Sequence, residues 1–427
     1  MSELFAEIIS IGDELLIGQV VNTNASWMAA ELNKNGIHVV QVSAIGDNGD
    51  RIKSALDEAF KRADIVLLTG GLGPTKDDIT KNVLAAYFNS EMVFHEPTYE
   101  HIKVLFRLRN YQVTEVNRMQ ALIPERCIPL KNNHGTAPGM WFEFGEKVAV
   151  SMPGVPFEMQ TLMREEVIPR LKQKFKLGII YHKTIMTHGF GESALAERIE
   201  AWESALPSAI KLAYLPQPGI VRLRLSISGD DELQLKEIVH QHCRQLTELI
   251  PELIFGYDDV LLEEVVGQQL KQLGKTMSAA ESCTGGYLSH LLTAISGSSA
   301  YFNGSVVSYS NAAKHQLLGV PEGVIEQFGA VSQQVVELMA TGARQRFFTD
   351  YALAVSGIAG PDGGTPEKPV GTVWIALATP ESVQSQLFHF GEHRGRNIRR
   401  SALAALNMLR VELKREFLVV GKGCCME

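Results

Sequence analysis

The 427-residue sequence contains few cysteines, few aromatic residues and no long apolar run. Its five cysteines are an odd number, and no spacing among them suggests a zinc site. We therefore expect reduced thiols and a cytoplasmic protein. No apolar run approaches the roughly 18 residues of a membrane-spanning helix, and the N-terminus lacks a signal-peptide pattern. These absences exclude a disulfide scaffold and predict no membrane partner.

Basic residues are not in excess, because 40 Lys and Arg face 48 Asp and Glu and the net charge is −8. Phosphate contacts need a basic face, so this balance disfavours a nucleic-acid partner. Low-complexity tracts and repeats are absent as well. What is present is ordinary for a globular protein, with 45% apolar and 21% charged residues. The length predicts two or three domains.

The first part of the chain alternates short apolar runs with helical patterns. This alternation predicts an α/β domain whose mainly parallel sheet has helices on both faces, a three-layer arrangement. In such sheets ligands bind beyond the carboxyl ends of the strands. The expected strands are Glu7–Ile11, Val39–Ala44, Asp64–Leu68 and Lys147–Ser151, and the expected helices include Asn24–Asn35 and Arg51–Arg62.

Residues near 175–255 change character. The order strand, helix, strand, strand, helix predicts a small two-layer α+β domain. We find no catalytic cluster in it, and a spacer or dimerisation element is the simplest interpretation. The last part again alternates, with strands expected at Thr276–Ala280, Ser305–Ser310, Tyr351–Val355 and Val373–Ala378 and helices at Leu261–Leu273 and Ile398–Glu412.

A Gly-rich loop, Thr69–Asp78, follows a strand and opens a helix. Its glycines let backbone N–H groups approach an anion at a helix N-terminus. Helix capping by Asp77 and Asp78 is the plain alternative. Capping does not explain Asp13, Glu14 and Asp47 at the ends of two other strands. Carboxylates converging beside a phosphate-binding loop favour a divalent cation with hard oxygen ligands, although turn carboxylates remain an alternative.

Three segments of the last third are the most informative. Ala280–Gly286 holds a serine hydroxyl, Tyr309–Lys314 an amine, and Ser356–Gly364 a second Gly-rich turn. A neutral serine needs a base, and a partly desolvated lysine can serve. N–H groups at Thr284–Gly286 can hold an oxyanion. Each segment alone is typical of a turn or a surface amine, and Cys283 is an alternative nucleophile.

Together these segments resemble the C-terminal domain of the CinA family, over roughly residues 257–415. The resemblance implies a nicotinamide-nucleotide amidase, an amidohydrolase that converts nicotinamide mononucleotide to nicotinate mononucleotide and ammonia in pyridine nucleotide (NAD) salvage. It places the catalytic pair on Ser282 and Lys314, with no cofactor. We expect substrate to contact Thr284, Gly285, Gly286, Tyr309, Asn311, Gly357, Gly360, Gly363 and Arg399. For Arg399 and its neighbours Arg394, Arg396 and Arg400, a solvated cluster at a helix start is an equal alternative.

The first 170 residues are similar to the molybdopterin-binding fold in its CinA version. That similarity implies a metal-dependent ADP-ribose pyrophosphatase, with a Mg-like or other divalent cation. The metal ligands would be Asp13, Asp47 and Asp78. The nucleotide-binding positions would be Gly70, Gly71, Gly73, Gly135, Pro153 and Gly154.

The combined prediction is a nucleotide hydrolase built from an N-terminal three-layer molybdopterin-binding-like domain, a small α+β domain and a C-terminal three-layer α/β amidase domain. The expected segments are residues 1–172, 173–256 and 257–415, followed by a tail, 416–427. Its partners would be small nucleotides and a second copy in a homodimer. A non-catalytic nucleotide-binding or competence and DNA-damage regulatory protein is the alternative, as is a protein in which only the N-terminal half is active.

Overall fold

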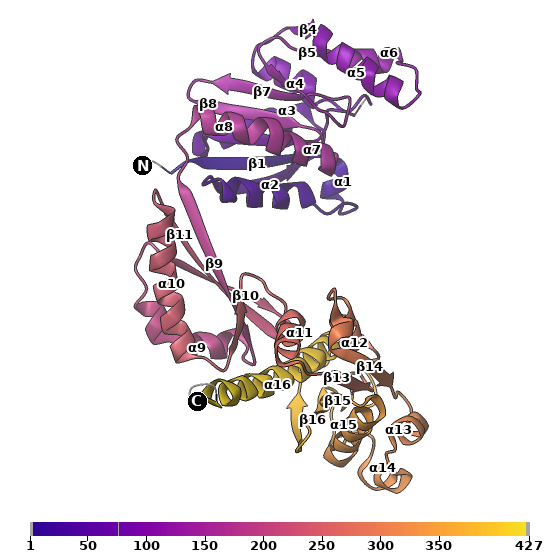
Figure 1. Cartoon of the computed structure of the whole chain (residues 1–427). Helices are drawn as coiled ribbons and strands as arrows, with labels where there is room; N and C mark the ends of the chain where they lie inside the picture. Colours follow the sequence, from indigo (N-terminus) through magenta and orange to yellow (C-terminus); the bar gives the residue numbers. More distant parts are fainter. Residues whose placement is uncertain (1–2, 76, 424–427) are drawn as a thin grey trace. The chain divides into compact units, whose positions relative to one another are not determined.

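The computed structural model describes residues 3–75 and 77–423, and the chain divides into two compact units (Figure 1). The first unit contains the chain up to Tyr181 together with residues 227–236. The second contains residues 182–226 and the chain from Glu237 onward. The four predicted segments, which cut the chain at 172, 256 and 415, stay a prediction.

The first unit is built on a six-stranded sheet in the order β2-β1-β3-β8-β7-β6. The first four of these strands pair in parallel, and β7 and β6 are antiparallel additions at one edge. The strands are β1 (Phe5–Ile11), β2 (His38–Ile45), β3 (Ile65–Thr69), β6 (Ile128–Leu130), β7 (Gly139–Phe144) and β8 (Lys147–Met152). A separate pair is formed by β4 (Met92–Phe94) and β5 (Leu122–Pro124).

Helices cover both faces of this sheet, so the predicted three layers are confirmed. Successive side chains of β1 point to opposite faces, and Ile8 accordingly packs in one core and Ile9 in the other. One layer contains α2 (Thr23–Lys34), α7 (Pro156–Leu162) and α8 (Ile168–Lys174), and the other contains α3 (Gly49–Arg62) and α4 (Thr80–Tyr87). The remaining helices are α1 (Asp13–Leu16), α5 (Glu96–Leu108), α6 (Glu115–Met119) and a π-helical turn, Met163–Val167.

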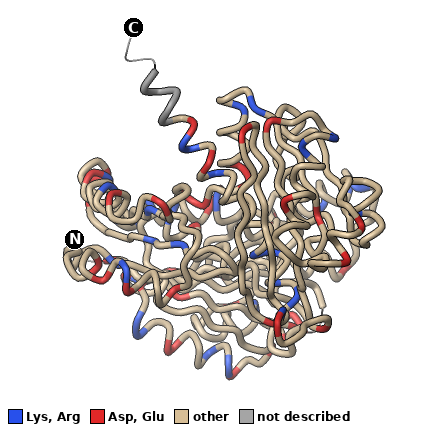
Figure 2. Tube along the Cα trace, turned by 90° about the horizontal axis from the view of Figure 1, so that it is seen from below, with Lys and Arg blue, Asp and Glu red and all other residues tan. Residues whose placement is uncertain are grey.

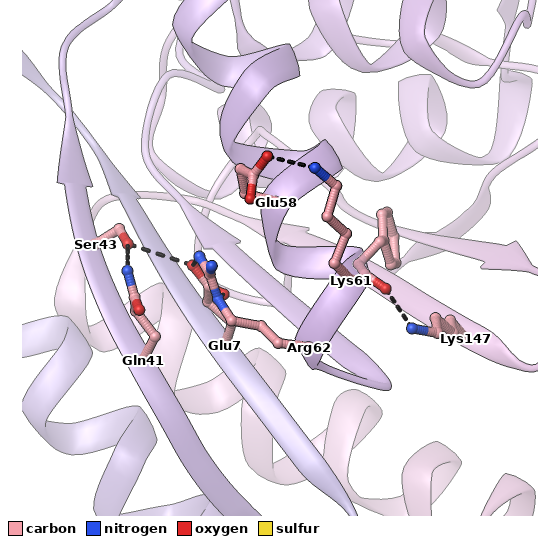
Figure 3. Close-up of polar contacts among 8 residues, drawn as sticks. Glu7, Gln41, Ser43, Glu58, Lys61, Arg62 and Lys147 are labelled. Carbon is pink, nitrogen blue, oxygen red and sulfur yellow. Dashed lines mark hydrogen bonds and ion pairs between the residues drawn. The ribbon is translucent and has the colours of Figure 1, made fainter.

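A carboxylate lies within this apolar framework. Glu7 of β1 is only 1% exposed, and Arg62 at the end of α3 donates to it from Nε at 2.7 Å and from Nη2 at 3.1 Å. Ser43 of the neighbouring β2 adds a third hydrogen bond at 3.3 Å (Figure 3). Because a buried charge is costly without partners, this cluster holds α3 against the sheet whose strand ends carry the second candidate site described below.

The predicted small α+β domain is also present. Its strand order is β10-β11-β9-β12, and two helices complete it. The elements are β9 (Ile179–His188), α9 (Glu192–Ser204), β10 (Lys211–Gln217), β11 (Ile220–Gly229), α10 (Glu232–Leu249) and β12 (Ile254–Tyr257). The sequence pattern did not predict β12.

The last sheet has the order β14-β13-β15-β16-β17, with β14, β13 and β15 parallel. Its strands are β13 (Met277–Glu281), β14 (Phe302–Val307), β15 (Tyr351–Gly357), β16 (Thr372–Ala378) and β17 (Val383–His389). Helices α11 (Leu262–Leu273), α12 (Tyr287–Thr293) and α16 (Arg394–Gly423) pack with one core. The other core involves α13 (Asn311–Leu318), α14 (Glu322–Phe328) and α15 (Gln333–Phe347), and Ser298–Ala300 forms a 3₁₀ turn.

Three local expectations differ from the structure. The strand expected at Ser305–Ser310 ends at Val307, so the residues after it are free to turn toward the site. The helix expected to begin within Thr284–Gly286 begins at Tyr287, because two left-handed glycines precede it. α16 continues to Gly423, into the predicted tail, while Cys424 and Cys425 lie outside the described residues.

Acidic and basic residues are interspersed along the described chain, as Figure 2 shows. No helix among the described residues is long and apolar enough to cross a membrane.

Candidate active sites

The first candidate site lies where three adjacent parallel strands end. Ser282 directly follows β13, Lys314 lies on the helix after β14, and Ser356–Gly357 end β15. These strands are neighbours in the order β14-β13-β15, so their carboxyl ends share one edge of the sheet. That edge is where an open α/β sheet places ligands.

Ser282 and Lys314 are brought into direct contact. The Nζ of Lys314 donates to the Ser282 Oγ at 3.0 Å and to the Ser308 carbonyl at 2.7 Å. Lys314 is 1% exposed and Ser282 is 9% exposed. The early end of β14 makes this possible, since Ser308 follows the strand and accepts from the amine. The pair therefore has the geometry that a nucleophile and its base need.

The environment of Lys314 favours the neutral amine. Burial lowers the pKa of Lys314 below its ordinary value of 10.5, and the neighbouring Cys283 opposes this with a lesser effect. No carboxylate of the described chain compensates the ammonium charge. A neutral amine keeps a lone pair, which is what a proton acceptor requires.

The alternative nucleophile, Cys283, has the opposite environment. Its side chain is buried, and burial raises the pKa of the Cys283 thiol to about 12. A thiolate is the reactive form of cysteine, so this thiol is held in its unreactive form. The hydroxyl of Ser282, not the Cys283 thiol, contacts the amine.

Glu281, which the sequence analysis left unassigned, organises the turn after β13. Its carboxylate is fully buried and accepts from the N–H groups of Gly286 at 2.9 Å, Leu288 at 3.1 Å and Ser289 at 2.9 Å. The Ser289 hydroxyl donates to it as well. Negative charge at the start of α12 is favourable, and the cluster fixes the path of the chain on either side of Ser282. A lone Glu before a Ser carries no sequence signal for this role.

The predicted oxyanion donors are only partly available. The Gly285 N–H donates to the Ser282 carbonyl at 3.1 Å, and the Gly286 N–H is held by Glu281. Thr284 is 3% exposed, and its Oγ1 is buried without a hydrogen-bond partner in the described chain. Since buried polar groups are normally paired, Thr284 is the residue of this turn that remains for an incoming group.

The basic residue beside this site is Arg394. Its guanidinium donates to the Gly360 carbonyl at 2.7 Å and to the Tyr309 hydroxyl at 3.1 Å. Burial raises the pKa of Glu263 of α11, the nearby Arg399 opposes this rise, and the predicted contact of Arg399 with substrate stays a prediction. Asn311 is exposed at the first turn of α13. Which arginine of α16 faces the site depends on the rotation of the helix about its axis, and local sequence patterns do not predict that rotation.

Two of the three predicted substrate-binding glycines of the β15–β16 loop have a packing reason to be glycine. A Cβ on Gly357 would meet Val373 at 2.6 Å, and one on Gly360 would meet Val370 at 2.5 Å. Gly360 also has φ +86°. Gly363 has φ +90° and more room. Their part in substrate binding stays a prediction.

The second candidate site is a cavity of about 470 Å³ at the strand ends of the first unit. Five of the six predicted nucleotide-binding residues line it, namely Gly70, Gly71, Gly73, Pro153 and Gly154. Gly135 does not, because it packs against Glu158 and Asn132. Gly70 has φ +108°, and a Cβ there would lie 2.1 Å from the Ile11 carbonyl. Helix α2 also begins at this cavity, and a helix N-terminus favours an anion.

Carboxylates gather at this cavity. Asp47 lines it and accepts from the Asp13 N–H at 3.1 Å. Burial raises the pKa of Asp47, and the nearby negative charges of Asp13, Glu14 and Asp77 add to the effect. Asp78 also lines the cavity, and its carboxylate accepts from the backbone and hydroxyl of Thr75. The Asp13 carboxylate instead lies against Gly46.

These donors fit a divalent cation in chemistry, since Mg²⁺ prefers carboxylate oxygens. No group of three His, Cys, Asp or Glu side chains is arranged to hold a metal within residues 3–75 and 77–423. Mg²⁺ is commonly held by one or two carboxylates together with substrate phosphates and water, so a magnesium site here does not need three protein ligands. The ligand roles of Asp13, Asp47 and Asp78 stay a prediction.

Among the polar residues of this cavity that sequence reasoning missed, two have a buried oxygen without a partner in the described chain. The Asn24 Nδ2 donates to the Gly154 carbonyl at 2.7 Å, and its Oδ1 is buried without a partner in the described chain. Gln120 also lines the cavity with an unpartnered Oε1. Asn24 was interpreted as part of a helix start, and Gln120 lies in a segment with no motif.

A CinA-like protein from Cytophaga hutchinsonii is 47% identical over 413 residues, which is 97% of this chain and 99% of its own length. The chain belongs to the CinA family. A CinA-like protein from Flavobacterium psychrophilum is 46% identical over 416 residues, with 96% of this chain and 99% of its own covered. The solved structure of the competence/damage inducible protein CihA from Agrobacterium tumefaciens is 40% identical, covers 36% of this chain and 93% of its own, and has a TM-score of 0.35.

Three domain families match successive parts of this CinA protein. Residues 7–173 match a probable molybdopterin binding domain, 182–256 the damage-inducible protein CinA KH domain, and 259–413 the CinA C-terminal domain. The predicted resemblance and fold class are therefore confirmed. The middle part, interpreted from sequence only as a spacer or dimerisation element, has a family description of its own.

Proposed function

We propose that this CinA protein hydrolyses the carboxamide of nicotinamide mononucleotide to nicotinate mononucleotide and ammonia. The observation that carries the proposal is the 3.0 Å contact between Lys314 Nζ and Ser282 Oγ, made by a buried lysine without a compensating carboxylate. The alternative of a purely regulatory protein does not account for that pair, because an uncompensated buried amine costs stability.

The reaction follows from the positions of these groups. Lys314 takes the hydroxyl proton as Ser282 Oγ bonds to the carboxamide carbon. Lys314 then gives that proton to the amide nitrogen, the C–N bond breaks, and ammonia leaves an ester on Ser282. Water attacks the ester, Lys314 accepts its proton, and the acid is released as Ser282 recovers its hydrogen. The Ser308 carbonyl holds the amine in place throughout.

The choice of a nucleotide substrate follows the family resemblance, with physical support from Arg394. This guanidinium sits beside Tyr309 and Gly360, where it can face a phosphate. The unpartnered Thr284 Oγ1 is a further contact for the substrate.

The decisive experiment measures ammonia release from nicotinamide mononucleotide by the full chain. Nicotinamide, nicotinamide riboside and NAD serve as comparison substrates, with and without chelator. We expect release that is insensitive to chelator and absent in Ser282→Ala. Cys283→Ala is the matched control, because it removes the neighbouring nucleophile and should retain activity. Activity lost in Cys283→Ala and kept in Ser282→Ala would overturn the proposal.

A second activity, hydrolysis of ADP-ribose to AMP and ribose phosphate, is proposed for the first unit. The cavity of about 470 Å³ with its Gly-rich loop and clustered carboxylates supports it. Asp47 and Asp78, the predicted ligands that line the cavity, would hold a divalent cation. When bound, that ion neutralises the pyrophosphate charge and polarises phosphorus. The chain itself orients Asp47 through the Asp13 N–H and Asp78 through Thr75.

The test is ADP-ribose hydrolysis with added Mg²⁺ or Mn²⁺ and in chelator. We expect Asp78→Asn to lose most of this activity and to leave ammonia release unchanged. Undiminished hydrolysis in chelator would contradict the metal requirement.

A cytoplasmic location and a homodimer belong to the same proposal. The three cysteines of the described chain are free, which suits a reducing compartment. Light scattering on the full chain tests the dimer.

A further inference from the structure

The second unit contains a cavity of about 670 Å³ that includes neither Ser282 nor Lys314 and shares no residue with the cavity of the first unit. It is lined by the loop after β9, the β10–β11 turn, β17 and the first turns of α16. Of the candidate site residues named in the sequence analysis, only Arg396 and Arg400, the neighbours of Arg399, line it. The cavity is therefore a separate feature of the molecule.

The walls of this cavity are held together by packing. Met186 of β9, Ile220 of β11 and Leu403 of α16 belong to one buried core. Gly219 approaches α16 so closely that a Cβ on it would lie 3.1 Å from Leu403. Further along α16, Arg410 donates to the Glu252 carbonyl at 2.9 Å. Since these contacts fix the elements against one another, the cavity is preformed.

Two guanidinium groups give this cavity a positive character. Arg396 and Arg400 both line it, and neither forms an ion pair with a carboxylate in the described chain. Arg400 lies over the Phe390 ring, 4.8 Å from its centroid. Glu192 is the one acidic residue among the lining side chains. Two unpaired guanidinium groups in a concave wall favour an anionic ligand such as a phosphate.

A buried polar side chain without a partner is the second, independent observation. His188 lines the cavity and is 9% exposed, and its Nδ1 is buried without a hydrogen-bond partner in the described chain. Burial, together with the charges of Arg410 and Arg400, lowers the pKa of His188 to about 4. The neutral imidazole leaves the positive potential to the arginines. Because buried polar groups are normally hydrogen-bonded, the unpartnered His188 Nδ1 also indicates where a bound ligand can supply a hydrogen bond.

Flat apolar surfaces complete the cavity. The Phe388 and Phe390 rings are stacked, with centroids 5.5 Å apart and planes 18° from parallel. Phe190, from the loop after β9, lines the cavity and is 43% exposed. An exposed phenylalanine beside stacked rings favours a ligand that itself has a planar ring.

We propose that this cavity binds a nucleoside monophosphate, with the phosphate on Arg396 and Arg400 and the base against Phe190. The site is separate from both proposed reaction sites and does not depend on either activity. A nucleoside monophosphate carries the two features that the lining residues select, an anionic group and a planar ring.

The test uses AMP as the probe and hydrogen–deuterium exchange of the full chain, read by mass spectrometry. We expect AMP to slow exchange in peptides that cover residues 188–192, 216–221 and 388–404. The AMP concentration that half-saturates this effect should rise at least tenfold in the double variant Arg396→Ala/Arg400→Ala, because charge-assisted hydrogen bonds to the phosphate are lost. Arg415→Ala is the matched control, since it removes an exposed guanidinium from the same helix and should change nothing.

A second variant keeps the test decisive if the double variant does not fold. Phe190→Ala should weaken AMP binding about tenfold, the cost of losing base stacking, and leave the protection given by inorganic phosphate unchanged. Equal AMP protection in wild type and the variants, or protection confined to residues 10–24 and 69–78, would overturn the proposal. Protection of these peptides by a single-stranded oligonucleotide but not by AMP would also overturn it, in favour of a nucleic-acid surface.

Discussion

Replacing Ser282 and Lys314 separately and together tests the amidase proposal most directly. Lys314→Met keeps the length of the side chain and removes the amine, and Ser282→Ala removes the nucleophile. The amine lies 3.0 Å from the hydroxyl, so both variants abolish the same step. General-base catalysis contributes about 10²–10⁴ in rate, so we expect Lys314→Met to lower kcat/KM about 10³-fold. At about 1.4 kcal/mol for each factor of ten, this is about 4 kcal/mol of transition-state stabilisation.

Loss of the nucleophile should cost more, about 10⁴-fold. Independent contributions would multiply to about 10⁷ in the double variant. Since the amine acts only on the Ser282 proton in the first step, the double variant should instead be no worse than about 10⁴-fold below wild type. The measurement is ammonia release from nicotinamide mononucleotide in a coupled assay, with thermal unfolding of each variant as a control. A double variant near 10⁷ would refute the shared step, and undiminished activity in Ser282→Ala would refute the nucleophile.

Four further outcomes follow from the structure. Burial lowers the pKa of Lys314 in the folded protein, so between that pKa and 10.5 the unfolded chain binds one more proton than the folded chain. The free energy of unfolding of wild type therefore increases as the pH rises through this range. Lys314→Met should be more stable than wild type at pH 7 in urea titrations, and the difference in stability should narrow toward pH 10. Glu281→Gln leaves buried N–H groups without an acceptor, and we expect a loss of about 3 kcal/mol in the free energy of unfolding, measured by denaturant titration; an unchanged midpoint would contradict this role. Asp47→Asn should abolish metal-dependent ADP-ribose hydrolysis while ammonia release, assayed in parallel, is unaffected. Fragments 182–427 and 257–427 should both release ammonia. The shorter fragment should unfold at a lower temperature in calorimetry, because it lacks Met186, Ile220 and Phe255, which share a core with the C-terminal domain. Equal unfolding temperatures would show that the middle domain does not stabilise the C-terminal one.

Much of the architecture was accessible from local patterns. The strand β3 reads as a continuous apolar run, and it is fully buried between two helical layers. The helix α3 has its apolar residues at helical spacing, and the structure places them in one core. The strand β7 was missed, because it is an antiparallel addition whose pairing with β8 is decided by residues beyond its own segment.

The sequence by itself also singled out the chemistry of the first candidate site. Ser282 and Lys314 lie in recognisable segments, and both segments follow strands. That their side chains meet, with the amine buried and hydrogen-bonded to the hydroxyl, is decided by the adjacency of β13 and β14. Strand adjacency depends on pairing between residues about 25 apart in the chain, which local patterns do not specify.

The remaining site features depended on tertiary contacts alone. Glu281 looked like an ordinary residue before a serine, and only the fold gathers four donors around it. Arg394 rather than Arg399 reaches Tyr309, because the rotation of α16 is set by the core that its other face buries. A sequence specifies which groups are available and on which elements they lie. Which of these groups come into contact depends on how distant segments bury their apolar faces against one another, and that packing exists only in the folded chain.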